Sequence, residues 1–177
     1  MKRGWLLALL LSACHSEEES AAKDRAESKK SWALVLKVDG ADVRLPLEMM
    51  NVLLFKSDEY AATNPSPVHL EGEGVSLYAE IAPADYVGYG EDWKKLIGQT
   101  ITVKPSGRYH REDVESRITL PGKEPIAVTG GTLQVEKFTG KWSGSEGNKT
   151  LSGRIQLTLY DGRTLEGTFA VHAVTWG

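Results

Sequence analysis

The chain has 177 residues, of which 41% are hydrophobic and 25% charged, and it carries a net charge of −3. These values are typical of a globular protein of one domain. A mildly acidic chain lacks the positive field with which proteins attract nucleic acid or anionic lipid, so its charge argues against both as partners.

Residues 1–13 have the parts of an export signal: a basic start at Lys2 and Arg3, an apolar run over 5–11, and small residues after it. The run is far shorter than the roughly 20 residues that a helix needs to cross a bilayer. The next residue is the only cysteine. Leu11-Ser12-Ala13-Cys14 resembles the lipobox of bacterial lipoproteins. That resemblance implies removal of residues 1–13 and lipidation of Cys14.

The resemblance also implies a location in the bacterial cell envelope, with the membrane as a partner through the lipid on Cys14. Several acyl chains hold a protein at a membrane stably, whereas one does not. The residue after Cys14 is His15 rather than aspartate. In the sorting pattern of enteric bacteria this resembles an outer-membrane destination. Once Cys14 is lipidated, no cysteine remains for a disulfide.

Residues 15–31 contain five acids, four bases and no apolar residue larger than alanine. Such a segment cannot bury enough surface to offset its ordering entropy. We expect residues 14–31 to be a flexible charged tether with a span on the order of 20–25 Å, or a transient charged helix. A single domain is predicted over 32–177.

From Trp32 onward the pattern is that of β-strands. Apolar residues alternate at 34, 36 and 38, then at 43, 45 and 47, on either side of an Asp39-Gly40 turn. This predicts a hairpin. The apolar run 49–55 predicts a buried strand, Asn64 to Pro67 a loop, and 75–81 a further alternating strand.

The segment "EDWKKLIG" (91–98) predicts one short helix. Asp92 is its expected cap, Trp93, Leu96 and Ile97 share a face, and Gly98 ends it. "TITV" (100–103) then resumes the sheet.

Three alternating strands are predicted near residues 130–138, 151–160 and 163–174, the last two joined by an Asp161-Gly162 hairpin turn. Many short antiparallel strands predict an all-β antiparallel β-sandwich with one short helix. A small OB-like or lipocalin-like β-barrel is the alternative. The expected inward residues are Leu133, Val135, Ile155, Leu157, Leu159, Leu165, Phe169 and Val171.

A second resemblance concerns the domain. "LKVDGADV", "HLEGEGVSLYAEIA" and "GGTLQVEKFTG…LSGRIQLTLYDGRTLEGTFAV" are similar to small β-sandwich domains of uncharacterised bacterial lipoproteins. This implies a sandwich in the cell envelope and gives no catalytic residue. "LIGQTITV" resembles a barrel strand of OB-folds, which keeps the barrel open as an alternative.

No nucleotide, cofactor or metal is expected. In "SGSEGNKT" (143–150), Ser143 and Asn148 stand where a phosphate-binding loop requires glycine. Two histidines have a glutamate two positions later, on the same side of a strand, but each pair supplies only two of the three or four ligands of a zinc site. These pairs are His69 with Glu71 and His110 with Glu112.

No catalytic residue is predicted. His172 lies in the opposite phase to Phe169 and Val171, so it is expected to face away from the core. The chain has no G-x-S-x-G elbow, and its one cysteine is assigned to lipidation.

The predicted binding surface is aromatic. Tyr86, Tyr89 and Trp93 lie in the glycine-rich connection "APADYVGYGEDW", and rigid aromatic side chains on such loops are common anchors. Trp93 alternatively packs with Leu96 and Ile97. Tyr109 and His110, in the mixed-charge run 107–117, form a second candidate surface, and that run is otherwise a solvated hairpin tip.

The sequence therefore predicts an outer-membrane lipoprotein whose domain is a binding or scaffolding module for an envelope protein or glycan. One alternative is an envelope hydrolase of glycan or peptide, which requires acids or histidines that converge in one cleft. Another is a small-ligand carrier with an apolar cavity.

Overall fold

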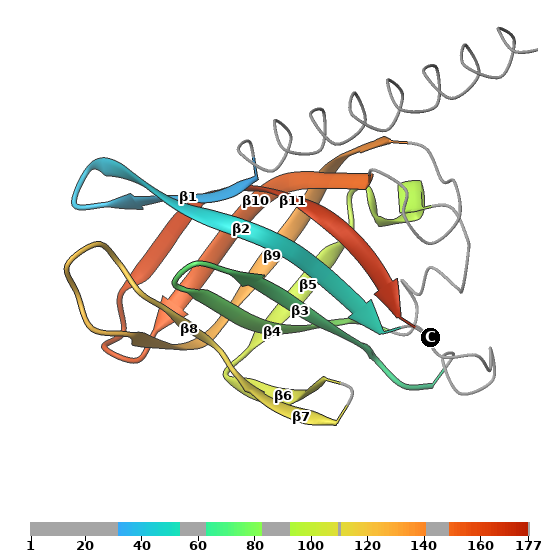
Figure 1. Cartoon of the computed structure of the whole chain (residues 1–177), viewed down its shortest axis with the longest axis horizontal. Coiled ribbons are helices and arrows are strands. Elements are labelled where there is room, and N and C mark those ends of the chain that lie inside the picture. Colours follow the sequence, from blue (N-terminus) through green and yellow to red (C-terminus); the bar gives the residue numbers. More distant parts are fainter. Residues whose placement is uncertain (1–31, 54–62, 83–92, 110, 141–148, 177) are drawn as a thin grey trace, which may run out of the picture. The chain divides into compact units, whose positions relative to one another are not determined.

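The computed structural model describes residues 32–53, 63–82, 93–109, 111–140 and 149–176. The predicted signal peptide, the predicted lipidation site at Cys14 and the predicted tether lie outside these ranges. The described part of the chain is all-β, as predicted, with one turn of 3₁₀-helix (Figure 1). It contains no helix with the length and apolar character of a membrane span.

The described part of the chain consists mainly of strands, many of which are joined by short connections. They are β1 (Ala33–Val38), β2 (Ala41–Leu53), β3 (Ser66–Gly72), β4 (Val75–Ile81), β5 (Thr100–Lys104), β6 (Ser106–Tyr109), β7 (Glu112–Glu115), β8 (Arg117–Ile118), β9 (Ile126–Gly140), β10 (Lys149–Leu159) and β11 (Thr164–Trp176), with the 3₁₀-helix η2 (Trp93–Leu96) before β5.

Eight strands close into a barrel. Their order is β10-β11-β1-β2-β3-β4-β5-β9, and β9 pairs with β10 to complete the ring. The short β8 pairs with both β4 and β9, and β6 and β7 form a separate two-stranded sheet. The closed ring fits the alternative prediction of a barrel and not the predicted sandwich. Alternation along a strand is the same in both folds, because it reports only which side faces a core.

Four glycines allow the strands to approach closely enough for closure. A Cβ at Gly72, Gly131, Gly153 or Gly167 would lie 1.9–2.2 Å from a carbonyl oxygen of a neighbouring strand. Any side chain at these positions would push two strands apart. Bends at glycines and bulges are the usual means of curving a sheet into a small barrel, and β10 also shifts register at Ser152/Gly153.

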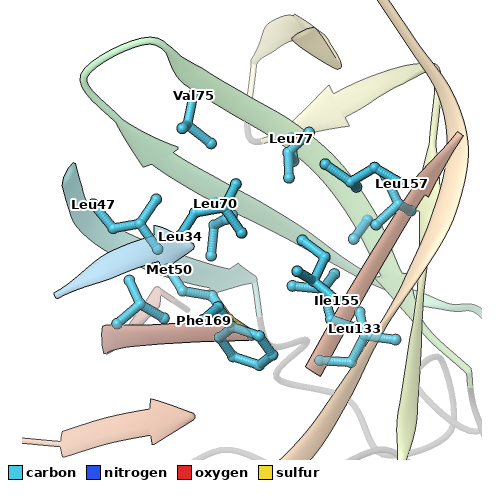
Figure 2. Packing of buried hydrophobic residues seen from close by; sticks show 14 of the residues in the cluster. Leu34, Leu47, Met50, Leu70, Val75, Leu77, Leu133, Ile155, Leu157 and Phe169 are labelled. Carbon is cyan, nitrogen blue, oxygen red and sulfur yellow. The ribbon is translucent and has the colours of Figure 1, made fainter. Parts of the chain in front are cut away.

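The barrel interior is filled by aliphatic side chains and Phe169 (Figure 2). All eight residues predicted to face inward from the last three strands are buried, as are Val75, Leu77, Ala79 and Ile81 of β4. The outward phase predicted for His172 is also confirmed, since its neighbours Val171 and Ala173 are buried while it is only half-buried.

Two local predictions need correction. The expected helix over 91–98 is, in its described part, a single 3₁₀ turn, in which Ile97 N donates to Lys94 O. Leu96 is buried but Ile97 is 45% exposed, because one tight turn cannot place both on the same face. The loop predicted over Asn64 to Pro67 ends earlier, since Ser66 already begins β3.

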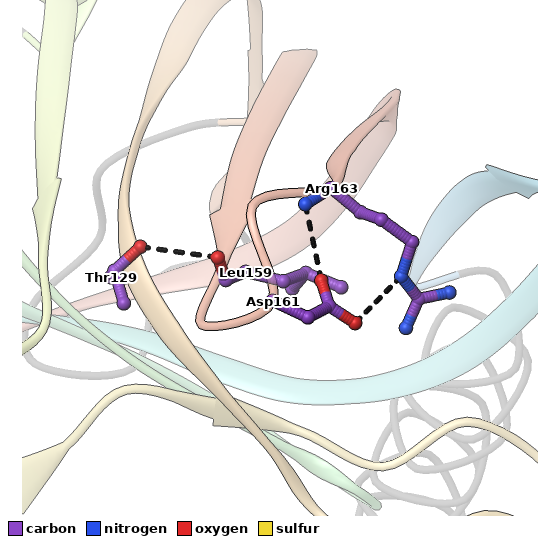
Figure 3. Close-up of polar contacts among 4 residues, drawn as sticks. All are labelled: Thr129, Leu159, Asp161 and Arg163. Carbon is purple, nitrogen blue, oxygen red and sulfur yellow. Dashed lines mark hydrogen bonds and ion pairs between the residues drawn. The ribbon is translucent and has the colours of Figure 1, made fainter.

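The predicted turns are confirmed. Asp39 and Gly40 both have positive φ, of 51° and 84°, between β1 and β2. At the β10–β11 turn the Asp161 carboxylate accepts hydrogen bonds from the backbone N (3.1 Å) and Nε (2.8 Å) of Arg163. Figure 3 shows this arrangement, together with Thr129 of β9, whose Oγ1 donates to Leu159 O at 3.4 Å.

Candidate functional site

Most of the predicted binding residues lie outside the described part of the chain. Cys14, Tyr86, Tyr89 and His110 are outside it, and of Trp93 only the backbone is described, as the first residue of η2. Tyr109 is described, and it is 93% buried rather than presented to solvent at a hairpin tip. The run 107–117 does form a hairpin, β6–β7, but its inner side is covered.

The β6–β7 hairpin packs against the outer face of β3 and β4 through a small second core. This core consists of Tyr78, Tyr109 and Val114, with Leu53 partly buried against it. Gly107 lies directly over the Tyr78 ring, since a Cβ there would be 2.0 Å from a ring carbon. We refer to Tyr78, Tyr109 and Val114 as the hairpin core.

Ser116 fixes the base of the hairpin to the barrel. Its buried hydroxyl accepts from Tyr78 N at 2.8 Å and donates to Lys104 O, and its backbone N donates to Pro105 O at 2.8 Å. The two ends of the hairpin are thereby tied to β4 and β5. This arrangement holds the hairpin core over the barrel wall.

His69 lies beside the hairpin core on the outer face of β3. It is half-buried, and its Nε2 is 3.2 Å from the hydroxyl oxygen of Ser76 on β4. The ring also contacts Tyr109, with centroids 5.9 Å apart and planes tilted by 50°. Burial lowers the pKa of His69 below its ordinary value of 6.5, while the charges of Glu71 and Glu112 act in the opposite direction.

A hollow of about 430 Å³ adjoins the His69–Ser76 pair, and we call it the wall hollow. An acid and a base line it on either side of a hydroxyl, because the strand register places Glu71 opposite Ser76 and Ser76 opposite Arg117. Its volume is within the range of small-molecule sites, about 300–1,000 Å³. The lining residues are Glu71, Gly72, Gly74, Val75, Ser76, Arg117, Thr119 and Pro125.

The two tyrosines of the hairpin core are shielded from water. Burial, helped by the adjacent Glu80 carboxylate, raises the pKa of Tyr78 to about 12. Tyr78 Oη donates to Glu80 Oε1 at 3.1 Å, and Glu80 Oε2 is 3.6 Å from Lys104 Nζ. Burial alone raises the pKa of Tyr109 above its usual range. At neutral pH both hydroxyls are protonated.

A second hollow, of about 460 Å³, lies on the opposite wall over β9, β10, β11 and β1. Its side chains are mostly amides, hydroxyls and paired charges. Arg154 Nε is 2.7 Å from Glu136 Oε1, Lys37 Nζ is 3.1 Å from Asp42 Oδ1, and Gln156 Nε2 donates to Glu166. These groups form ion pairs and hydrogen bonds with one another. The second hollow therefore leaves fewer polar groups for a ligand than the wall hollow does.

The described residues contain no cluster of three or more His, Cys, Asp or Glu side chains that could hold a metal ion. The fold does bring parts of the two predicted His/Glu pairs together, because Glu112 of β7 acts electrostatically on His69 of β3. His110 lies outside the described residues.

Comparisons with known proteins give no assignment for the chain. No protein-family model matches it, and searches of curated proteins and of solved structures find no match either. The candidate site therefore depends on its own geometry.

The sequence did not single out Ser76 or Arg117. Alternation already places Ser76 on the outer face, out of phase with Val75 and Leu77. The sequence does not show that β4 pairs with both β3 and β8. This pairing puts His69, Glu71 and Arg117 around that hydroxyl.

Proposed function

We propose that this protein is a bacterial envelope lipoprotein whose barrel is a binding module held at the outer membrane by a lipid on Cys14. The anchor is supported by the basic start, the short apolar run and the lipobox-like Leu11-Ser12-Ala13-Cys14. The charged composition of 15–31 supports a spacer between the lipid and the barrel.

Lipidation is tested by metabolic labelling with an alkyne fatty acid in a bacterial host. The full chain incorporates the label and enters the detergent phase on Triton X-114 partition. Cys14→Ser loses both properties, while Ser16→Ala, two residues away, keeps both. Label retained by Cys14→Ser would remove the anchor from the proposal.

The binding role is carried by one observation, the row Glu71–Ser76–Arg117 that lines the wall hollow. An acid, a hydroxyl and a guanidinium around one depression offer complementary charges and hydrogen bonds to a polar ligand. Neither Glu71 nor Arg117 makes an ion pair with another described residue. We infer that the ligand is a polar group on an envelope protein or glycan.

Site-specific photo-crosslinking in the intact envelope tests this surface. A photoreactive phenylalanine at Thr119, on the rim of the wall hollow, is expected to capture a defined adduct. The same residue at Gln156, an exposed position on the opposite wall, is the matched control and gives none. Equal patterns from both positions, or no adduct from Thr119, would contradict the assignment.

The aromatic segment stays a prediction as a second contact surface. Tyr86→Ala combined with Tyr89→Ala is expected to weaken the Thr119 adduct while the barrel stays folded by circular dichroism. An unchanged adduct would mean that these tyrosines do not contact the partner. The carrier alternative gains no support from the described part of the chain, in which the barrel interior is filled by side chains (Figure 2).

A further inference from the structure

Ser76 and His69 are the one serine–histidine pair in hydrogen-bond contact among the described residues, and Ser76 also lines the wall hollow. A hydroxyl beside an imidazole and open to a small-molecule-sized hollow is the arrangement that nucleophilic catalysis requires. We propose that Ser76 and His69 form a nucleophile–base pair that hydrolyses a small carboxylic ester bound in the wall hollow. This inference rests on the proposed function, since it needs a ligand in that hollow.

The imidazole is held in place for this role. His69 lies between Asn51 and Tyr78 in the strand register, and its ring contacts Tyr109 from the hairpin. When the ring proton is on Nδ1, the Ser76 hydroxyl donates to Nε2 across 3.2 Å. This distance is at the long end of the range for a nucleophile and its general base.

The electrostatics of the site favour the base form and then its protonated product. Burial lowers the pKa of His69, so the ring is neutral and able to accept a proton at neutral pH. Glu71 and Glu112 are close enough to act on the ring through their charge, and they stabilise the imidazolium that forms when Ser76 loses its proton. Desolvation thus favours the neutral base before the proton transfer, and the neighbouring acids favour the imidazolium after it.

Arg117 supplies the charge opposite to the developing oxyanion. It pairs with Ser76 in the β4–β8 register, and both line the wall hollow. Its guanidinium is permanently charged and donates planar hydrogen bonds. Electrostatic stabilisation of this kind is commonly the largest single contribution to acyl transfer.

The bond changes balance as follows. Ser76 Oγ attacks the carbonyl carbon of the ester while His69 Nε2 takes the hydroxyl proton. The C–O bond to the alcohol breaks, and the alcohol leaves with the proton from His69. Water then attacks the acyl-serine and gives its proton to His69. The bond between the acyl carbon and Ser76 Oγ breaks, His69 returns the proton to that oxygen, and the acid is released. No oxidant, reductant or metal takes part.

A fluorophosphonate probe tests the pair directly, since a serine attacks its phosphorus, fluoride leaves, and a stable Ser Oγ–P bond marks the nucleophile. The detergent-solubilised full chain is labelled and the adduct mapped by tandem mass spectrometry. We expect the adduct on Ser76 in the wild type. It is lost in Ser76→Ala, and it forms at least about 100-fold more slowly in His69→Gln, the size of a typical general-base contribution.

The matched control is Ser152→Ala, a half-buried serine on the outer face of β10, which labels on Ser76 like the wild type. Hydrolysis of p-nitrophenyl acetate is followed in parallel, with a rate that falls only below pH 6.5. Because free imidazole also hydrolyses activated esters, the mapped adduct decides.

A folded wild-type chain with no adduct on Ser76 overturns the inference without any variant. Labelling that is insensitive to His69→Gln, with an unchanged circular dichroism spectrum, also overturns it. The Thr119 crosslink in a chain that keeps Ser76 separates the two proposals, because a hollow that binds without catalysis gives this crosslink although Ser76 fails to label.

Discussion

Gly130 and Gly131 are adjacent on β9, yet only one of them has a steric requirement. A Cβ at Gly131 would lie 2.1 Å from Gln156 O, and the residue has φ of +147°. A Cβ at Gly130 would meet only Val103 O, at 4.0 Å. The close approach of β9 to β10 therefore depends on the second glycine and not on the first.

We predict that Gly131→Ala lowers the free energy of unfolding by about 3 kcal/mol or more, because overpacking and an unfavourable φ act together. Gly130→Ala is the control, and its effect is expected within about 0.5 kcal/mol. Urea unfolding followed by circular dichroism measures both. Equal losses for the two variants would show that strand approach at Gly131 does not limit closure.

His69 links the site to pH. Its pKa is lowered in the folded chain, chiefly by burial, so between 6.5 and that lower value the unfolded chain binds more protons than the folded one. The contribution of His69 to the free energy of unfolding is therefore fully present above pH 6.5 and is lost as the pH is lowered through this window. His69→Gln is expected to flatten this part of the profile.

Urea unfolding at closely spaced pH values from 8 to 5 measures the slope. Glu73→Gln, an exposed acid in the β3–β4 turn, serves as the control and keeps the wild-type profile. If His69→Gln retains the full slope, another group is responsible for it.

At the scale of elements, the β6–β7 hairpin acts as a cover held by Gly107 and Ser116. Gly107→Ala places a methyl group into the Tyr78 ring, so we expect the hairpin to move off the hairpin core while the barrel remains closed. Tyr78 then becomes hydrated, and its pKa falls from about 12 toward the ordinary 10. Absorbance titration near 295 nm detects this change.

Two variants make that titration specific. The difference between the wild type and Tyr78→Phe identifies the signal of Tyr78 and separates it from that of Tyr109, which burial also shifts upward. Ser106→Ala, next to Gly107 and exposed, leaves the titration unchanged. A Gly107→Ala chain whose Tyr78 still titrates near 12 would mean that the hairpin accommodates the methyl group in place.

The strands themselves could be predicted from the sequence, because one buried face imposes an alternation of period two. The inward residues of β4 and of β9 to β11 were identified in this way, and so were the turns at Asp39-Gly40 and Asp161-Gly162. Barrel closure could not be, since it depends on the pairing of β9 with both β5 and β10 and on which glycines approach a neighbouring strand.

The candidate site shows the same limit. His69 with Glu71 was visible as a pair on one strand face, but Ser76, Arg117 and Glu112 come from three other strands. The run 107–117 was expected to be solvated because it is highly charged. Its alternation instead buries Tyr109 and Val114 and exposes the charges, which is visible only once the hairpin has a surface to cover.

At the scale of the whole barrel, the wall has a seam where β11 passes from one partner to another. β11 pairs antiparallel with β1 up to Ala170 and parallel with β2 from Ala173 onward. Trp32, the residue before β1, is buried and stacks on His172 between these two stretches, with ring centroids 5.0 Å apart and planes within 15°. Its carbonyl also accepts from Leu47 N at 3.2 Å. Trp32 therefore fills the place where β1 begins.

We predict that Trp32→Ala opens this seam, with a loss of about 3–5 kcal/mol in the free energy of unfolding. Amide hydrogen exchange should rise most at Ala173–Trp176 and Met50–Leu53, because these paired stretches follow His172 and Leu47, the two residues that Trp32 contacts. Trp32→Phe keeps an aromatic ring against His172 and is expected to lose less. If exchange rises evenly around the barrel instead, Trp32 adds to the general core and does not seal the seam. A rise confined to the two named stretches would identify the start of the domain as the element that closes its wall.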